Sequence, residues 1–298
     1  MSSLSCARAR EMLYQTWDKN DRKDTKVILY LLSSGISKPF YDPLINQTMD
    51  IQELSNTYHQ VTIARTRCLN SLVNHNLTLY FPEAEQFLHA FRSEWFCEFL
   101  LKFPTPNSIT RYKKATFVRR AWTVIGRKQY KQQFLEHIYD IAASSIGLPV
   151  DLTSVAVETY KLQLNRYIEF TRQRLVLEKQ SEAFLADRAD YQRLRTLSGV
   201  GAIIAFIIIA ESGDLNRFNH YRVLLGISKK GDRYPRCLLV QGSKTVVSRA
   251  KGKDDKLSRW INRIVETRGH NRACVAYANK MSRMAWAVMT SGENHITS

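Results

Sequence analysis

The sequence predicts a mainly α-helical protein with a short N-terminal unit, a helical middle and a basic C-terminal helical domain. Between residues 24 and 191 glycine and proline are scarce, and apolar residues recur every three or four positions, which is typical of successive helices. Of the 298 residues, 44% are hydrophobic and 11% are aromatic, as in a folded globular protein. We therefore divide the chain into segments 1–50, 51–190 and 191–298.

Turn-forming segments separate the helices predicted for the middle of the chain. They combine Gly, Pro, Ser and Asn at 33–43, 81–82, 103–107 and 147–149. A long polar helix with an incomplete apolar stripe is predicted from Val155 to Ala189. It is interpreted either as a partner for another helix or as a solvated connector between domains.

Positive charge is concentrated in the C-terminal segment. Residues 191–298 hold 19 Lys and Arg against 7 Asp and Glu, a net charge of +12, which leaves +5 of the total of +17 for the other 190 residues. Such an excess favours a polyanionic partner, because Lys and Arg set against phosphates release condensed counterions. A basic surface that serves only solubility is the alternative.

Cysteine usage and hydropathy exclude several classes of protein. The five cysteines are widely spaced, with neither a Cys-x-x-Cys pair nor a His at ligand spacing, so neither disulfides nor zinc are expected. The longest apolar run, 200–210, is shorter than the ~20 residues of a membrane span. The first ten residues lack the apolar segment of a secretory signal. We expect a cytoplasmic protein with no membrane partner.

A glycine turn in the C-terminal segment is the first candidate nucleic-acid-binding element. Leu197-Ser198-Gly199-Val200-Gly201 precedes an apolar helix, as in a helix-hairpin-helix motif. Because glycine has no Cβ, the backbone N–H groups of such a turn can approach a phosphate closely. Gly199 and Gly201 are therefore candidate binding residues, and a plain connection between two helices is the alternative.

A basic loop after this apolar helix is the second candidate. It carries Lys229, Lys230, Arg233 and Arg236, with Tyr234 among them. Contacts to phosphates are the natural use of such a loop, and a solvated charged turn is the alternative.

Two carboxylates near the N-terminus form a candidate metal site. Asp21 and Asp24 stand three residues apart just before a predicted helix, Thr25–Leu32, so they share a helix face. Carboxylate oxygens bind Mg²⁺, and metal ions bridged by acids serve phosphodiester chemistry. The alternative is that these acids stabilise the helix start by interacting with its unpaired N–H groups and its dipole.

Several segments together resemble a known family. In their order along the chain they are similar to bacterial insertion-sequence transposases, also described as bridge-RNA-guided recombinases, which have an N-terminal RuvC-like DEDD nuclease domain, a helical linker and a C-terminal domain with a nucleophilic serine. The segments are Asn20-Asp21-Arg22-Lys23-Asp24, Leu197-Ser198-Gly199-Val200-Gly201, Ala210-Glu211-Ser212-Gly213-Asp214, Ile227-Ser228-Lys229-Lys230-Gly231-Asp232 and the aromatic blocks Arg92-Ser93-Glu94-Trp95-Phe96 and Lys102-Phe103-Pro104-Thr105-Pro106.

The resemblance implies a transposase that binds DNA, with a guide RNA as a candidate second partner and a homo-oligomer as a candidate assembly. It assigns Asp21 and Asp24 as catalytic, metal-binding acids, with Mg²⁺ as the cofactor once the remaining acids complete the site. It also implies that residues 1–50 are a remnant of an α/β RuvC-like domain.

Two departures from the family pattern imply that the copy is N-terminally truncated and internally deleted. No strand that could carry the family's first catalytic Asp is predicted before Trp17, and only eight residues separate Phe218 from Ile227, where the family has the serine-bearing segment. The nucleophilic serine is not identified. We therefore expect a transposase with lost or reduced catalysis; the alternative is a non-catalytic nucleic-acid-binding regulator of related elements.

Overall fold

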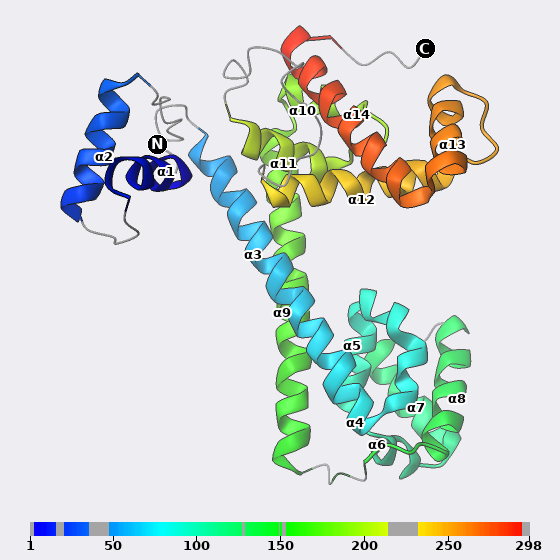
Figure 1. Ribbon diagram of the computed structural model, residues 1–298. Coiled ribbons are helices and arrows are strands. Elements are labelled where there is room, and N and C mark those ends of the chain that lie inside the picture. The colour runs from blue at the N-terminus through cyan, green and yellow to red at the C-terminus, as the bar shows by residue number, and fades with distance from the viewer. Residues whose placement is uncertain are drawn as a thin grey trace.

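The computed structural model describes residues 3–15, 21–35, 48–126, 129–148, 150, 153–213 and 232–293 (Figure 1). These residues form helices and short connections, with no strand among them, so the mainly α prediction is confirmed. No helix in these ranges is long and apolar enough to cross a membrane. The helices are α1 (Ser3–Tyr14), α2 (Asp21–Ser33), α3 (Met49–Ser71), the π-helix η1 (Leu72–Leu77), α4 (Thr78–Tyr80), the 3₁₀-helix η2 (Pro82–Arg92), α5 (Glu94–Lys102), α6 (Pro106–Thr110), α7 (Lys114–Ile125), α8 (Gln129–Ala143), α9 (Val155–Leu185), α10 (Ala189–Arg195), α11 (Ala202–Ser212), α12 (Arg233–Arg249), α13 (Lys256–Arg268) and α14 (His270–Ser291).

Two long helices, α3 and α9, form a stalk between two groups of shorter helices (Figure 1). They run side by side in opposite directions. The lower lobe, η1 to α8, lies at one end of the stalk, and the upper lobe, α10 to α14, lies at the other. The long helix predicted from Val155 is therefore confirmed, and it pairs with another helix while it also connects two packed units.

Partly buried polar contacts fix how α3 and α9 lie against each other. The Arg65 guanidinium donates to the Thr171 hydroxyl at 3.0 Å and to the Tyr167 hydroxyl at 2.6 Å. Nearer the upper lobe, the Tyr58 hydroxyl donates to Glu178 at 3.0 Å, and burial raises the pKa of Tyr58, which keeps it a neutral donor. These contacts join positions about a hundred residues apart in sequence and set the register of the stalk.

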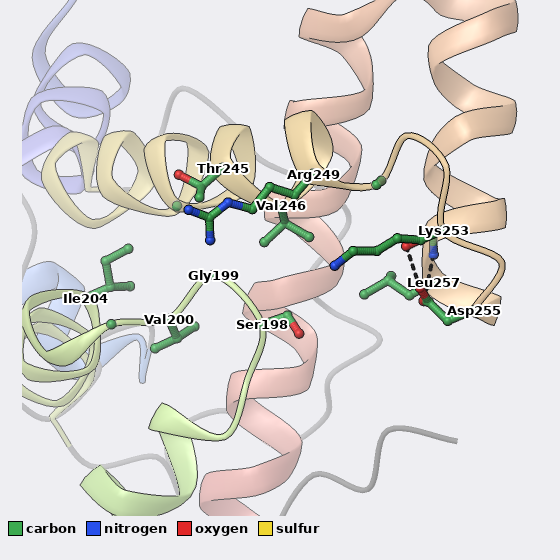
Figure 2. A pocket seen from close by; sticks show the side chains of 14 residues that line it. Ser198, Gly199, Val200, Ile204, Thr245, Val246, Arg249, Lys253, Asp255 and Leu257 are labelled. Atoms are coloured by element: carbon green, nitrogen blue, oxygen red, sulfur yellow. Dashed lines mark hydrogen bonds between the residues drawn. The ribbon is translucent and has the colours of Figure 1, made fainter.

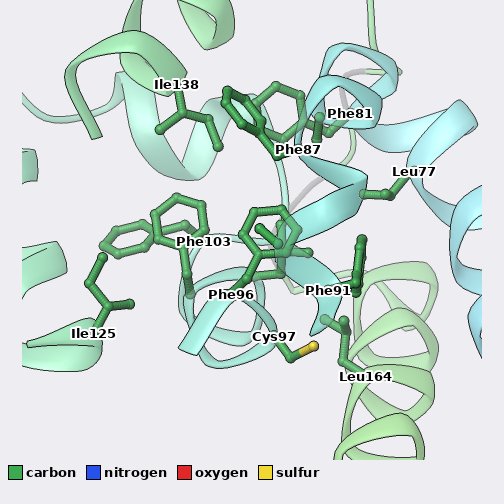
Figure 3. Close-up of a cluster of buried hydrophobic side chains, with 14 of the residues drawn as sticks. Leu77, Phe81, Phe87, Phe91, Phe96, Cys97, Phe103, Ile125, Ile138 and Leu164 are labelled. Carbon is green, nitrogen blue, oxygen red and sulfur yellow. The ribbon is translucent and has the colours of Figure 1, made fainter. Parts of the chain in front are cut away.

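The lower lobe is built around aromatic side chains (Figure 3). The Phe96, Phe99 and Phe134 rings lie 5.5–6.3 Å apart between centroids, in edge-to-face and stacked pairs. Such pairs add to the free energy gained from burying the ring area. Cys97 is packed against this cluster, and burial raises its pKa to about 12. All five cysteines are free, as predicted.

The upper lobe has a separate core around α11. Residues 205–210 are all buried, because α11 is apolar on every face and is surrounded by α10, α12 and the stalk. Ile51 and Tyr58 of α3 belong to the same core, together with Tyr277 and Met281 of α14. The division at residues 50 and 190 remains a prediction, and the packing shows that the stalk contributes side chains to this core.

The N-terminal helices α1 and α2 pack on each other through Ala9, Val27 and Leu31. Ile28 and Leu32 remain exposed. The α/β remnant expected for residues 1–50 is not shown, because the described residues of that segment form helices and turns. Helix formation there is consistent with the two acids in the first turn of α2, which favour a helix start.

Replacing Phe99 by alanine is expected to destabilise the protein by about 3–5 kcal/mol, because it leaves a cavity among stacked rings. The free energy of unfolding in urea measures this. The matched control is Phe184→Ala on the stalk, where the ring is 48% exposed and the expected loss is roughly 1 kcal/mol or less. Equal losses for both variants would contradict the placement of Phe99 in the core.

Candidate nucleic-acid interface

The glycine turn predicted from sequence forms a tight hairpin between α10 and α11. The Val200 N–H donates to the Leu197 carbonyl at 3.0 Å, and the Tyr277 hydroxyl donates to the Ser198 carbonyl at 2.7 Å. Burial raises the pKa of Tyr277 to about 12, so this donor stays protonated at neutral pH. The hairpin is thereby fixed to α14.

Gly199 is required for packing as well as for the turn. Its φ of +87° lies in the left-handed region, and a Cβ there would lie 2.9 Å from Val246 Cγ2. The opposing Gly242 of α12 would place a Cβ 2.4 Å from the Gly199 carbonyl oxygen. Two glycines therefore allow the hairpin to lie directly on α12, and for Gly199 the geometry favours the structural alternative.

Gly201 differs, because it lies at the open end of the hairpin. A Cβ there would meet no atom within 4 Å, and Gly201 is the N-cap residue of α11. The first bond within the helix runs from the Ala205 N–H to the Gly201 carbonyl at 3.0 Å. The N–H groups of residues 202–204 therefore have no partner within the helix, and an anion is favoured at this end.

A cavity of about 730 Å³ lies between the hairpin, the second half of α12 and the turn into α13. Arg249 and Lys253 line it, and their side chains extend toward the hairpin (Figure 2). Neither side chain forms an ion pair with a carboxylate among the described residues. Two cations beside a helix N-terminus can bind a phosphate.

Asp255 is the one acid in the cavity lining, and its carboxylate is engaged at the start of α13. It accepts from the Ser258 hydroxyl at 2.6 Å and from the Ser258 N–H at 2.9 Å. These two hydrogen bonds lower the pKa of Asp255. The carboxylate therefore serves to cap α13, and it forms no ion pair with Arg249 or Lys253.

The other predicted binding residues lie elsewhere. Arg233 and Arg236 are in the first turns of α12 and do not line the cavity. Asp232 caps this end of α12 by accepting from the Tyr234 N–H at 2.7 Å, and Tyr234 stacks on His59 of α3 at 3.9 Å between ring centroids. Lys229 and Lys230 lie outside the described residues.

The sequence does not single out Arg249 and Lys253 as candidate binding residues. The available signal was the high density of cations in 191–298, of which both are members. Their proximity to Gly201 depends on α12 crossing the hairpin at Gly242, which no local motif reports.

Asp21 and Asp24 lie in the first turn of α2, and the Arg10 side chain forms an ion pair with Asp24. No group of three or more metal-ligating side chains occurs in the described ranges. The position of both acids in the first turn of α2 is consistent with the helix-start alternative, and Arg10 is a described partner of Asp24. The assignment of both acids to Mg²⁺ and catalysis stays a prediction.

Comparison with known proteins gives distant homology to insertion-sequence transposases, as the sequence resemblance predicted. The chain is 35% identical over 174 residues to "Transposase for insertion sequence element IS1111A" of Coxiella burnetii, which covers 52% of this chain and 47% of that protein. It is 34% identical over 133 residues to a "Probable family 20 transposase" of Pseudomonas aeruginosa, covering 38% and 39%. The chain thus matches about half or less of the length of these relatives. No protein-family profile and no solved structure matches the chain.

Replacing Gly199 by alanine is expected to destabilise the protein by about 2 kcal/mol or more, because alanine is disfavoured at positive φ and its methyl group would press on Val246. Gly201→Ala is the matched control, since its backbone is extended and its Cβ would lie in open space, and roughly 1 kcal/mol or less is expected. Thermal unfolding of both variants measures this. A Gly199→Ala protein as stable as the wild type would contradict the close packing of the hairpin on α12.

Proposed function

We propose that this chain, a distant homologue of insertion-sequence transposases, acts in DNA transposition by holding the DNA phosphate backbone in the cavity between its glycine hairpin and α12. The cavity places Arg249 and Lys253 beside the N-terminus of α11, and this observation carries the proposal. Phosphate oxygens would accept from both side chains and from the backbone N–H groups that follow Gly201.

The charge around the cavity supports a polymeric anion over a small one. Lys251 and Lys256 are exposed on the same turn between α12 and α13, so cations continue beyond the cavity rim. A chain of phosphates can engage several of these side chains together, and each contact releases counterions. The transposase homology favours DNA, and a guide RNA is the competing ligand because it offers the same phosphates.

We propose further that the chain binds DNA without carrying out strand transfer by itself. The ion pair between Arg10 and Asp24 supports this, since it occupies one of the two oxygens with which Asp24 could hold a catalytic metal ion. Asp21, in the same helical turn, would have to find its other ligands elsewhere. This proposal makes the chain a DNA-binding participant in transposition, such as a regulator of related elements.

Removing the two cavity cations in Arg249→Gln/Lys253→Gln is expected to weaken duplex DNA binding. The logarithm of the affinity falls with the logarithm of the salt concentration, and each lost phosphate contact makes this dependence shallower by about 0.9. Losing two contacts should therefore make the slope shallower by about 2. Fluorescence anisotropy with a labelled 30-base-pair duplex at several salt concentrations measures this.

The matched control is Arg8→Gln/Lys26→Gln, which removes the same charge from exposed positions on α1 and α2. Its salt slope should equal that of the wild type. If both double variants change the slope equally, net charge and not the cavity determines binding. A wild-type protein that binds neither duplex DNA nor RNA would overturn the proposed function.

The absence of strand transfer is tested separately, with a supercoiled plasmid that carries the ends of the element encoding this chain. In the presence of Mg²⁺ we expect no joined or nicked product above the level seen without protein. Mg²⁺-dependent products that disappear in Asp21→Asn/Asp24→Asn would overturn the non-catalytic proposal and establish both acids as catalytic, while the binding proposal would stand.

A further inference from the structure

The lower lobe carries a second positive surface, far from the C-terminal segment. Between Glu98 and Glu136 the sequence has nine Lys and Arg and no acidic residue. Four of these cations, Arg111, Lys113, Arg119 and Arg120, are exposed around the connection from α6 to α7. We call these four residues the α6–α7 surface.

Two arginines of the α6–α7 surface are held in place by one aromatic ring. The guanidinium carbons of Arg111 and Arg120 lie 4.6 and 4.5 Å from the centroid of the Tyr112 ring. Arg120 also donates to the Tyr112 hydroxyl at 3.1 Å. The Tyr112 carbonyl accepts from the Tyr139 hydroxyl of α8 at 2.8 Å, which ties the connection to the lobe. A guanidinium stacked on a ring keeps in-plane N–H groups that can donate to a phosphate.

The cations of this surface are not ion-paired within the described part of the chain, although Glu136 lines one pocket together with Arg119. Lys114, the neighbour of Lys113, forms an ion pair with Asp140 at 2.7 Å. None of the four cations of the α6–α7 surface forms an ion pair with a described carboxylate. Preordered, unpaired arginines are more typical of a phosphate-binding surface than of a solvated face, where acids normally alternate with bases.

We propose that the α6–α7 surface is a second binding surface for the phosphate backbone of duplex DNA, engaged by the same duplex that the hairpin cavity holds. The inference rests on the proposed function for the identity of the polymer. In Figure 1, α7 lies on the same side of α9 as α12 and α13. The 31-residue helix α9 is about 46 Å long, which sets the scale of the separation between the two surfaces.

A duplex can bridge a separation of this scale. At 3.4 Å per base pair, about 14 base pairs cover the length of α9. DNA is stiff over this distance, since its persistence length is about 150 base pairs, so a straight duplex reaches both surfaces without a bending cost. A flexible single strand would have to be extended to do the same, which favours the duplex.

The test is the double variant Arg111→Gln/Arg120→Gln in the full-length protein, with labelled duplexes of 30 and 10 base pairs. For 30 base pairs the salt slope should become shallower by about 2, because two phosphate contacts are lost. The 10-base-pair duplex is too short to reach from the cavity to the α6–α7 surface. Its slope should therefore equal that of the wild type.

Two further variants separate local contacts from charge and folding. Arg8→Gln/Lys26→Gln removes the same charge from α1 and α2, helices that lie on the opposite side of the stalk from α7 in Figure 1, and should leave both slopes unchanged. Arg111→Lys/Arg120→Lys keeps the charge and should retain most of the wild-type slope. Thermal unfolding of each variant checks that the lobe stays folded.

Three results would overturn the inference. The first is that Arg111→Gln/Arg120→Gln keeps the wild-type salt slope on the 30-base-pair duplex, while Arg249→Gln/Lys253→Gln binds that duplex more weakly. This result would leave the proposed function standing. The second is that the salt slope of Arg111→Gln/Arg120→Gln becomes shallower by the same amount for both duplex lengths, which would show that the two surfaces do not share one duplex. The third is that Arg111→Gln/Arg120→Gln weakens binding to a single-stranded RNA but not to duplex DNA, which would assign the surface to RNA.

Discussion

The antiparallel contact between α3 and α9 determines the placement of nearly everything else. The lower lobe is formed by the chain between these two helices, and the upper lobe follows α9 directly. A shift of α9 against α3 would break the hydrogen bonds of Arg65 and Tyr58 and would displace both lobes together. Because these polar groups are partly buried, losing a partner costs more than the bond itself contributes, which makes the register specific.

The hairpin depends on the upper lobe in the same way. Gly199 and Gly242 allow two backbones to touch, and this contact places the start of α11 opposite the end of α12. The cavity is therefore a consequence of core packing. The hairpin forms one of its walls, and Arg249 and Lys253 line the opposite wall. Gly199 itself serves packing: it positions Gly201 and the start of α11, where the N–H groups without helical partners lie.

The sequence predicted the helical class and the long helix from Val155, because each follows from local periodicity. It also marked the glycine turn before α11, whose assignment as a helix-hairpin-helix motif stays a prediction. It did not predict the partner of α9, since the apolar stripe is incomplete and Leu175 within it is 50% exposed. Polar pairs such as Arg65 with Tyr167 complete that interface, and periodicity does not detect them. The sequence also did not single out Arg249 and Lys253, the proposed phosphate-binding residues, because they belong to a cation-rich segment in which no single member is distinguished.

The distribution of charge also has to be interpreted in three dimensions. Net charge by segment pointed only to residues 191–298, because acids elsewhere in the first 190 residues offset the acid-free run between Glu98 and Glu136. Several of those acids have other partners in the fold: Glu94 pairs with Arg172 of the stalk, and Glu178 pairs with Arg174. Within the run itself, Lys114 pairs with Asp140. What remains exposed around Tyr112 is a cationic surface that neither averaged charge nor a motif reveals. Cations that form no ion pair with a described carboxylate, on the α6–α7 surface and at the hairpin cavity, place positive charge in both lobes, an arrangement suited to one long polyanion.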